Sequence, residues 1–152
     1  MSATQEFEAI RAFGEHEHRE ILWELGRIHE AAGEVGLGSH IEARRAVREV
    51  IAWLARTLEP HMAWEDTWLY PQLELITGTS WSTRMARFDH VQIGSLIARL
   101  REDEAVTAHS ITPASTRELG ADLLALEALL RAHIDREEQL LLPVLEGSGL
   151  GA

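Results

Sequence analysis

The sequence predicts an all-α fold: an up-down-up-down four-helix bundle built from two pseudo-twofold-related helical hairpins. Hydrophobic residues recur with helical periodicity along the chain, and proline occurs only four times. The chain also repeats itself with an offset of 72 residues, from His18, which recurs as His90, to Glu74, which recurs as Glu146. Two copies of one helical hairpin account for both observations.

The first hairpin is expected to contain two helices. The first helix runs from about Glu6 to Ala32, and the next glycines are expected to end it: Gly33, Gly36 and Gly38. Ser39 and Glu42 have the spacing of a capping box. The second helix therefore opens at this point and continues to His61.

The second hairpin begins after a loop expected at Ile76–Ser80, and Ser80 or Ser82 is expected to cap the third helix. A polar stretch from about Ala105 to Ile111 separates the third helix from the fourth. Thr112 followed by Pro113 is a typical cap and first-turn pair, because proline loses nothing where the amide has no helical partner. The fourth helix is expected to run to about Glu146.

Three prolines fall inside the predicted helices. Pro71 and Pro143 occupy equivalent positions in the repeat and predict a matched kink or break near each helix end. Pro60 has no counterpart and predicts a local bend just before His61.

The repeat preserves residues that can bind metal ions. His18 recurs as His90, and the pair His61 and Glu65 recurs as His133 and Glu137. Residues four apart lie on one face of a helix. If the second and fourth helices are diagonal in the bundle, both pairs face its axis. The predicted metal ligands are His18, His61, Glu65, His90, His133 and Glu137.

Four imidazoles and two carboxylates can hold two metal ions, each with two histidines and with Glu65 and Glu137 as bridges. Imidazole together with carboxylate suits iron, and manganese less specifically. Zinc usually saturates at four ligands, so a shared site of six favours a metal that accepts more. We therefore expect two iron ions, bridged by oxide, hydroxide or water, with positions left open for a small molecule.

The pattern resembles the hemerythrin family, specifically the bacterial hemerythrin-like proteins of the HHE cation-binding domain. The residues that carry the resemblance are His18, His61-x-x-x-Glu65 followed by Leu69-Tyr70-Pro71, His90, and His133-x-x-x-Glu137-Glu138 followed by Leu141-Leu142-Pro143. The resemblance covers nearly the whole chain. It implies a single hemerythrin-like domain over residues 1–152, with internal repeats at about 18–74 and 90–146 and a flexible tail at 147–152.

The sequence departs from the oxygen-carrying hemerythrins at two points. Those carriers place a His-x-x-x-His pair on the third helix, whereas Ala86 and Gly94 stand four residues either side of His90. The resemblance thus implies more open coordination, which favours peroxide, nitric oxide or oxygen-sensing chemistry over simple oxygen carriage. The carriers also use an acidic residue that corresponds to Glu138. Glu137 fits the internal repeat better, and Glu138 remains the alternative, as His16 does for His18.

Two functions are consistent with these expectations. The first is a non-haem di-iron protein that acts on or senses peroxide, oxygen or nitric oxide, with catalase- or peroxidase-like turnover as its enzymatic form. The alternative is an iron- or oxygen-sensing module without turnover that signals through an unidentified protein partner. A helical interaction module without metal is the third reading.

Composition excludes several other classes of protein. A formal charge of −11 argues against binding to nucleic acid, which requires a basic surface. The absence of cysteine excludes disulfides, iron–sulfur clusters and zinc-thiolate sites. No apolar run approaches the roughly 20 residues of a membrane span, and the first residues do not resemble a signal peptide. A cytoplasmic location is therefore expected.

The aromatic residues and the other histidines are assigned by helical spacing. Trp68 is expected to lie on the metal-facing side of its helix, mainly as a core-packing residue and also as an apolar wall that excludes bulk water. Tyr70 is expected to lie well around the helix from His61. Core or helix-packing positions are expected for Trp23, Trp53 and Trp81. Surface positions are expected for His29, His40 and His109.

Overall fold

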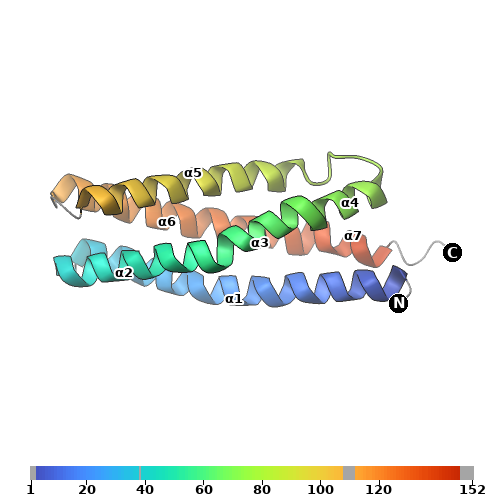
Figure 1. Cartoon of the computed structure of the whole chain (residues 1–152), viewed down its shortest axis with the longest axis horizontal. Coiled ribbons are helices and arrows are strands. Elements are labelled where there is room, and N and C mark those ends of the chain that lie inside the picture. The colour runs from blue at the N-terminus through green and yellow to red at the C-terminus, as the bar shows by residue number, and fades with distance from the viewer. Residues whose placement is uncertain (1–2, 38, 108–111, 148–152) are drawn as a thin grey trace.

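The computed structural model describes residues 3–37, 39–107 and 112–147, and these residues form helices and turns without a β-strand. Gly38, residues 108–111 with His109, and the predicted tail from Ser148 onward lie outside the described residues. The helices form an up-and-down bundle (Figure 1). Within the described ranges, no helix combines the length and the hydrophobicity that a membrane crossing requires.

The described residues form four helical segments. The first is α1 (Ala3–Leu37), and the third, after a turn at residues 78–83, is α5 (Arg84–Thr107). The second consists of α2 (His40–Trp53), the π-helical turn η1 (Leu54–Leu58), α3 (Glu59–Trp64), the π-helical turn η2 (Glu65–Leu69) and α4 (Tyr70–Thr77). The fourth consists of α6 (Pro113–Arg136), the π-helical turn η3 (Glu137–Leu141) and α7 (Leu142–Gly147).

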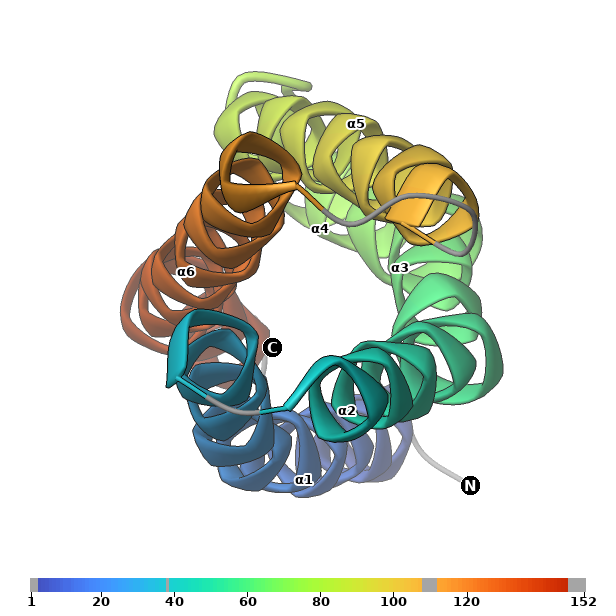
Figure 2. The ribbon, with the colours of Figure 1, turned by 90° about the vertical axis from the view of Figure 1, so that its left-hand side faces the viewer.

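The segments surround a common axis (Figure 2). Helix α1 packs against α2 and α6, and α5 also packs against both. The second and fourth segments are therefore diagonal, as the sequence analysis required for a shared interior site.

Two apolar clusters fill the interior on either side of one polar layer. The larger cluster contains Leu25, Leu54, Ile97 and Leu126, and the smaller contains Ile10, Leu69, Ala86 and Leu141. In each segment the predicted ligands lie between a residue of one cluster and a residue of the other, as His18 does between Ile10 and Leu25. The polar layer is thus sealed by hydrocarbon along the bundle axis.

Helix α1 is longer than the sequence predicted. It continues through Gly33 and Gly36 to Leu37 instead of ending near Ala32. Each glycine inside a helix costs about 1 kcal/mol relative to alanine. Burial of Val35, which packs in the larger cluster beyond Gly33, offsets that cost.

The predicted caps are confirmed where the structure describes them. The side chain of Ser39 accepts a hydrogen bond from the backbone N–H of Glu42 in a capping box, and Thr112 caps α6 in the same way. The loop after α4 begins later than predicted, because the helix includes Ile76 and Thr77. Helix α5 begins at Arg84, so neither Ser80 nor Ser82 directly precedes it.

The three internal prolines each come just after a π-helical turn. The turns η1, η2 and η3 end two residues before Pro60, Pro71 and Pro143 respectively. Proline donates no hydrogen bond to the carbonyl one turn earlier, and its ring crowds that carbonyl. The wider turn accommodates the proline, so that each segment continues as a helix, and the second segment changes direction around α3 (Figure 1).

Candidate metal centre

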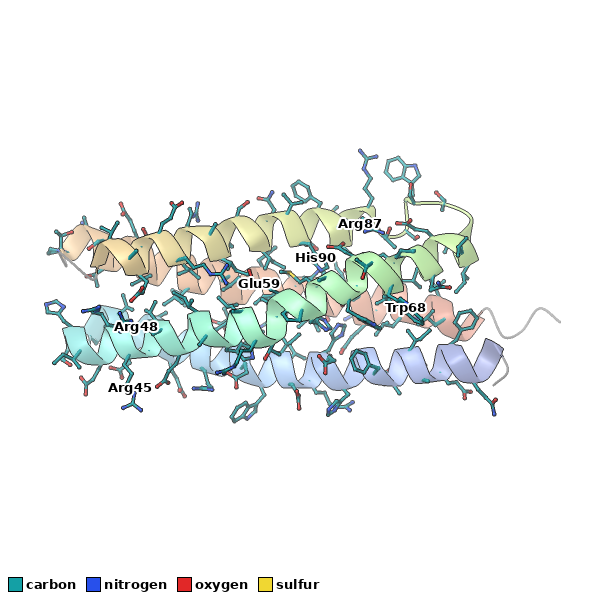
Figure 3. The ribbon with its side chains drawn as sticks, in the orientation of Figure 1. Arg45, Arg48, Glu59, Trp68, Arg87 and His90 are labelled. Atoms are coloured by element: carbon teal, nitrogen blue, oxygen red, sulfur yellow. The ribbon has the colours of Figure 1, made fainter. Side chains whose placement is uncertain are left out.

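The structure brings all six predicted ligands together in the polar layer. His18 comes from α1, His61 from α3 and Glu65 from η2, and the other three come from α5, α6 and η3. Each of the six residues is no more than 7% exposed. His90 lies on α5 beside the second helical segment (Figure 3).

The carboxylate of Glu65 separates two pairs of histidines. Its Oε1 atom lies 3.0 Å from His61 Nε2 and 3.4 Å from His18 Nε2. Its Oε2 atom lies 3.1 Å from His90 Nε2 and 4.0 Å from His133 Nε2. Each oxygen therefore faces a different pair of imidazoles.

Glu137 lies between the same two pairs. Its Oε2 atom is 3.2 Å from His18 Nε2 and 3.5 Å from His133 Nε2. The Nε2 atoms of His90 and His133 are themselves only 3.1 Å apart. The six groups thus form one compact cluster of nitrogen and oxygen donors.

A carboxylate lies behind the Nδ1 atom of every histidine in the cluster. Asp66 Oδ2 is 3.1 Å from His90 Nδ1, and Asp89 Oδ2 is 3.4 Å from His133 Nδ1. At ion-pair distances, Glu138 Oε1 is 3.4 Å from His18 Nδ1 and Glu17 Oε2 is 3.8 Å from His61 Nδ1. For His90 and His133 the hydrogen bond holds the proton on Nδ1 and directs the lone pair of Nε2 into the site, whereas the Nδ1 atoms of His18 and His61 make no hydrogen bond to a described residue.

Three of these outer carboxylates, Glu17, Asp66 and Asp89, were not predicted, and Glu138 was considered only as the alternative to Glu137, although the sequence carries a signal for all four. Glu17 and Asp89 are 72 residues apart, as are Asp66 and Glu138, so the repeat includes them too. Only the identity of the acidic side chain differs within each pair.

The structure places the two alternative ligand candidates, Glu138 and His16, outside the cluster. Glu137 points into the cluster, whereas Glu138 approaches His18 from outside with its side chain 38% exposed. His16 is exposed and lies 3.7 Å from Glu20 on the surface of α1. The other described histidines outside the cluster are exposed as predicted: His29 and His40.

The predicted position of Tyr70 was wrong. The side chain is fully buried, donates its hydroxyl proton to Glu137 Oε1 and lies 3.2 Å from His90 Nε2. The cause is η2, in which the backbone N–H of Tyr70 bonds to the carbonyl of Glu65, five residues earlier. One extra residue in a turn rotates the subsequent residues by about 100° around the helix axis, which brings Tyr70 to the interior.

The predicted apolar wall at Trp68 was also wrong. Trp68 lies within η2 and is 42% exposed, and it stacks on Trp64 instead of facing the cluster. Trp53 is buried as predicted, but Trp23 and Trp81 are more than 70% exposed. Trp23 lies on the exposed face of α1, and Trp81 lies in the turn before α5.

Mutual electrostatics keep His18 and Glu65 charged and Tyr70 neutral in this buried layer. Burial by itself lowers the pKa of His18, but the carboxylates of Glu137 and Glu65 outweigh burial and raise it to about 10. Burial likewise opposes ionisation of Glu65, yet the surrounding histidines hold its pKa well below the usual range. Burial first, and then the nearby carboxylates, raise the pKa of the Tyr70 phenol.

The donor set fits a metal cation. His61 Nε2, Glu65 Oε2 and Glu137 Oε2 are buried and make no hydrogen bond to any described residue. Two groups of residues have donor atoms within 4.8 Å of one another: Glu65, His90, His133 and Glu137, and His18, His61 and Glu65. A cation would satisfy the unpaired lone pairs, which otherwise carry the cost of burial.

The fold and the cluster define a helical-bundle protein with an interior histidine–carboxylate site compatible with metal binding. The family model described as the hemerythrin HHE cation binding domain matches residues 10–145. The chain therefore belongs to the hemerythrin HHE family, which confirms the resemblance seen in its motifs. Searches of curated proteins and of solved structures found no significant match.

Proposed function

We propose that this protein is a non-haem di-iron protein that acts on or senses peroxide, oxygen or nitric oxide. The observation that carries the proposal is the division of Glu65 between two pairs of histidines, because each carboxylate oxygen would then bind a different ion. His18 and His61 would hold one ion, His90 and His133 the other, and Glu137 would provide the second bridge. Imidazole and carboxylate donors of this kind suit iron, and manganese less well.

The chain's own residues prepare the site for a small ligand. Asp66 and Asp89 orient the imidazoles of His90 and His133, and the two apolar clusters exclude bulk water on either side of the polar layer. The Tyr70 hydroxyl donates its proton to Glu137 Oε1, and it would donate the same proton to a ligand that bound beside this carboxylate. Two iron ions bound here would supply Lewis acidity and redox capacity at open coordination positions.

Elemental analysis of aerobically purified protein, together with its visible spectrum, tests this proposal. We expect about two irons per chain, as in other di-iron bundles, and charge-transfer absorption. His61→Ala and Glu137→Ala should lose both signals, while the exposed control His16→Ala should retain them. A spectrum without such bands, from protein that binds no iron on reconstitution, would refute the proposal.

Turnover and sensing are distinguished by the response to hydrogen peroxide. Catalytic consumption by the iron-loaded protein would assign a catalase- or peroxidase-like activity. Reversible spectral changes with oxygen or nitric oxide, and no consumption of peroxide, would assign the sensing function, which then needs a protein partner.

A further inference from the structure

A row of aromatic rings leads from the candidate metal centre to the protein surface. The ring of Trp64 lies 6.4 Å from that of His61, centroid to centroid, with an interplanar angle of 30°. Trp68 stacks on Trp64 with a centroid distance of 6.4 Å and an interplanar angle of only 19°, and it is 42% exposed. A half-buried indole therefore connects a buried histidine to an exposed indole.

Trp64 packs against the smaller apolar cluster, but packing of the bundle does not require an aromatic pair at these two positions. The equivalent positions in the second half of the chain hold Arg136 and Leu140, although His133 and Glu137 are buried there just as well. The aromatic row is thus present on one side of the cluster only. Phe13 covers the edge of Trp64, with centroids 4.9 Å apart at 63°, and helps to keep it in place.

We propose that Trp64 and Trp68 form an electron relay between the metal centre and small one-electron reductants at the surface. This inference rests on the proposed di-iron function. Indole is among the side chains that are most easily oxidised by one electron, and transfer between rings decays steeply with distance. Two short steps through stacked rings are therefore much faster than one long step from solvent to the buried cluster.

Electrons and protons balance when this relay takes part in the reduction of hydrogen peroxide. Conversion of peroxide to two water molecules consumes two electrons and two protons. Trp64 would supply one electron and become a cation radical, the other electron would come from the bound metal pair, and solvent would supply both protons. Trp68 then reduces Trp64 and releases its own indole proton to solvent. A reductant of the ascorbate class returns the electron to Trp68, water returns the proton, and the reductant leaves as its radical. A second molecule of the same reductant replaces, through Trp68 and Trp64, the electron that came from the metal pair.

Two other tryptophans provide controls within the same chain. Trp23 and Trp81 are 72% and 74% exposed, more than Trp68, and neither stacks on the row. Oxidants that diffuse through solvent would attack these two residues first. Oxidation that travels from the cluster would instead appear on Trp64 and Trp68.

The test uses the iron-loaded full chain, treated with hydrogen peroxide in the absence of reductant. Freeze-quenched samples are examined by electron paramagnetic resonance for an indole radical, and peptides are analysed by mass spectrometry for oxygen added to each tryptophan. We expect several-fold more oxidation at Trp68 and Trp64 than at Trp23 and Trp81, and suppression by ascorbate. Trp64→Phe should abolish the radical on Trp68, and the exposed Trp68→Phe should slow reduction by ascorbate several-fold, while Trp23→Phe changes neither.

Iron content and peroxide response, recorded on the same samples, separate the two proposals. Normal iron and a normal peroxide response, with oxidation distributed according to exposure, would overturn the relay alone. Radical yield and ascorbate kinetics that are unchanged in both Trp64→Phe and Trp68→Phe would also overturn it. Protein that holds no iron, or that leaves peroxide untouched, would overturn the relay together with peroxide turnover.

Discussion

At the scale of single residues, a carboxylate behind a histidine acts on the site through the imidazole that it orients. Asp89 is almost fully buried, and it contacts both His133 and the guanidinium of Arg136. It therefore fixes the orientation of an imidazole that cannot be oriented by water. Loss of such a group typically weakens metal binding by about 10- to 100-fold.

Asp89→Asn is accordingly expected to lower metal affinity within this range while the protein still folds, because asparagine keeps the shape of aspartate without its charge. Competition with a chelator measures the affinity. Asp135→Asn is the matched control, since Asp135 is exposed on the same helical segment as His133 and bonds only to Gln139 among the described contacts. Equal affinities for the two variants would show that Asp89 has no orienting role.

Tyr70 provides a second prediction at the residue scale. Tyr70→Phe removes the donor to Glu137 but keeps the buried ring, so the metal-free protein should lose about 1–3 kcal/mol of unfolding free energy. Urea denaturation of the metal-free protein measures this loss. A variant as stable as the parent would mean that the hydroxyl contributes nothing to the charged interior.

At the scale of helices, the periodic pattern predicted most of the structure but not its π-helical turns. Apolar spacing and caps located the four segments, because both depend on interactions within a few residues. The extra residue in η2 cannot be read from the apolar spacing, because Leu69 is an apolar residue that is buried in the structure, as the spacing predicts. The periodic pattern therefore brought His61 and Glu65 to the interior face of the segment and misplaced Trp68 and Tyr70, which lie later in η2 and just after it.

Two glycines give opposite predictions for helix stability. Gly78 ends α4 with a left-handed φ of 68°, so Gly78→Ala should destabilise the protein by about 1–2 kcal/mol. Gly94 is exposed inside α5, and a Cβ there meets nothing within 4 Å. Gly94→Ala should therefore stabilise the protein by about 0.5–1 kcal/mol. Thermal denaturation of both variants checks the signs, and a shift in the same direction for both would contradict these assignments.

At the scale of the whole molecule, the charged interior makes the metal-free protein sensitive to pH. The pKa of His18 is raised to about 10 in the folded protein, so its stabilising contribution is complete below the ordinary value of 6.5. That contribution is lost as pH rises from 6.5 through about 10. Metal binding must displace this proton, so affinity for the metal should rise over the same range.

Urea denaturation of the metal-free protein at pH 6.5 and at pH 9.5 tests this prediction. The midpoint should fall at the higher pH, and the control His16→Ala should show the same fall because His16 is exposed. A midpoint that is constant or higher at pH 9.5 would contradict the assignment of a charged His18.

The shared position of Glu65 has a consequence for how such a chain can be divided. Residues up to Thr77 contain one complete group of donors, but the second group borrows Glu65 from that first hairpin. The second hairpin is therefore not self-sufficient, and a single hairpin would need a second copy of itself to hold a pair of ions. Because both copies lie in one polypeptide, they are always present together, and the sequence of each half can differ from that of the other. The two tryptophans on one side of the centre are such a difference.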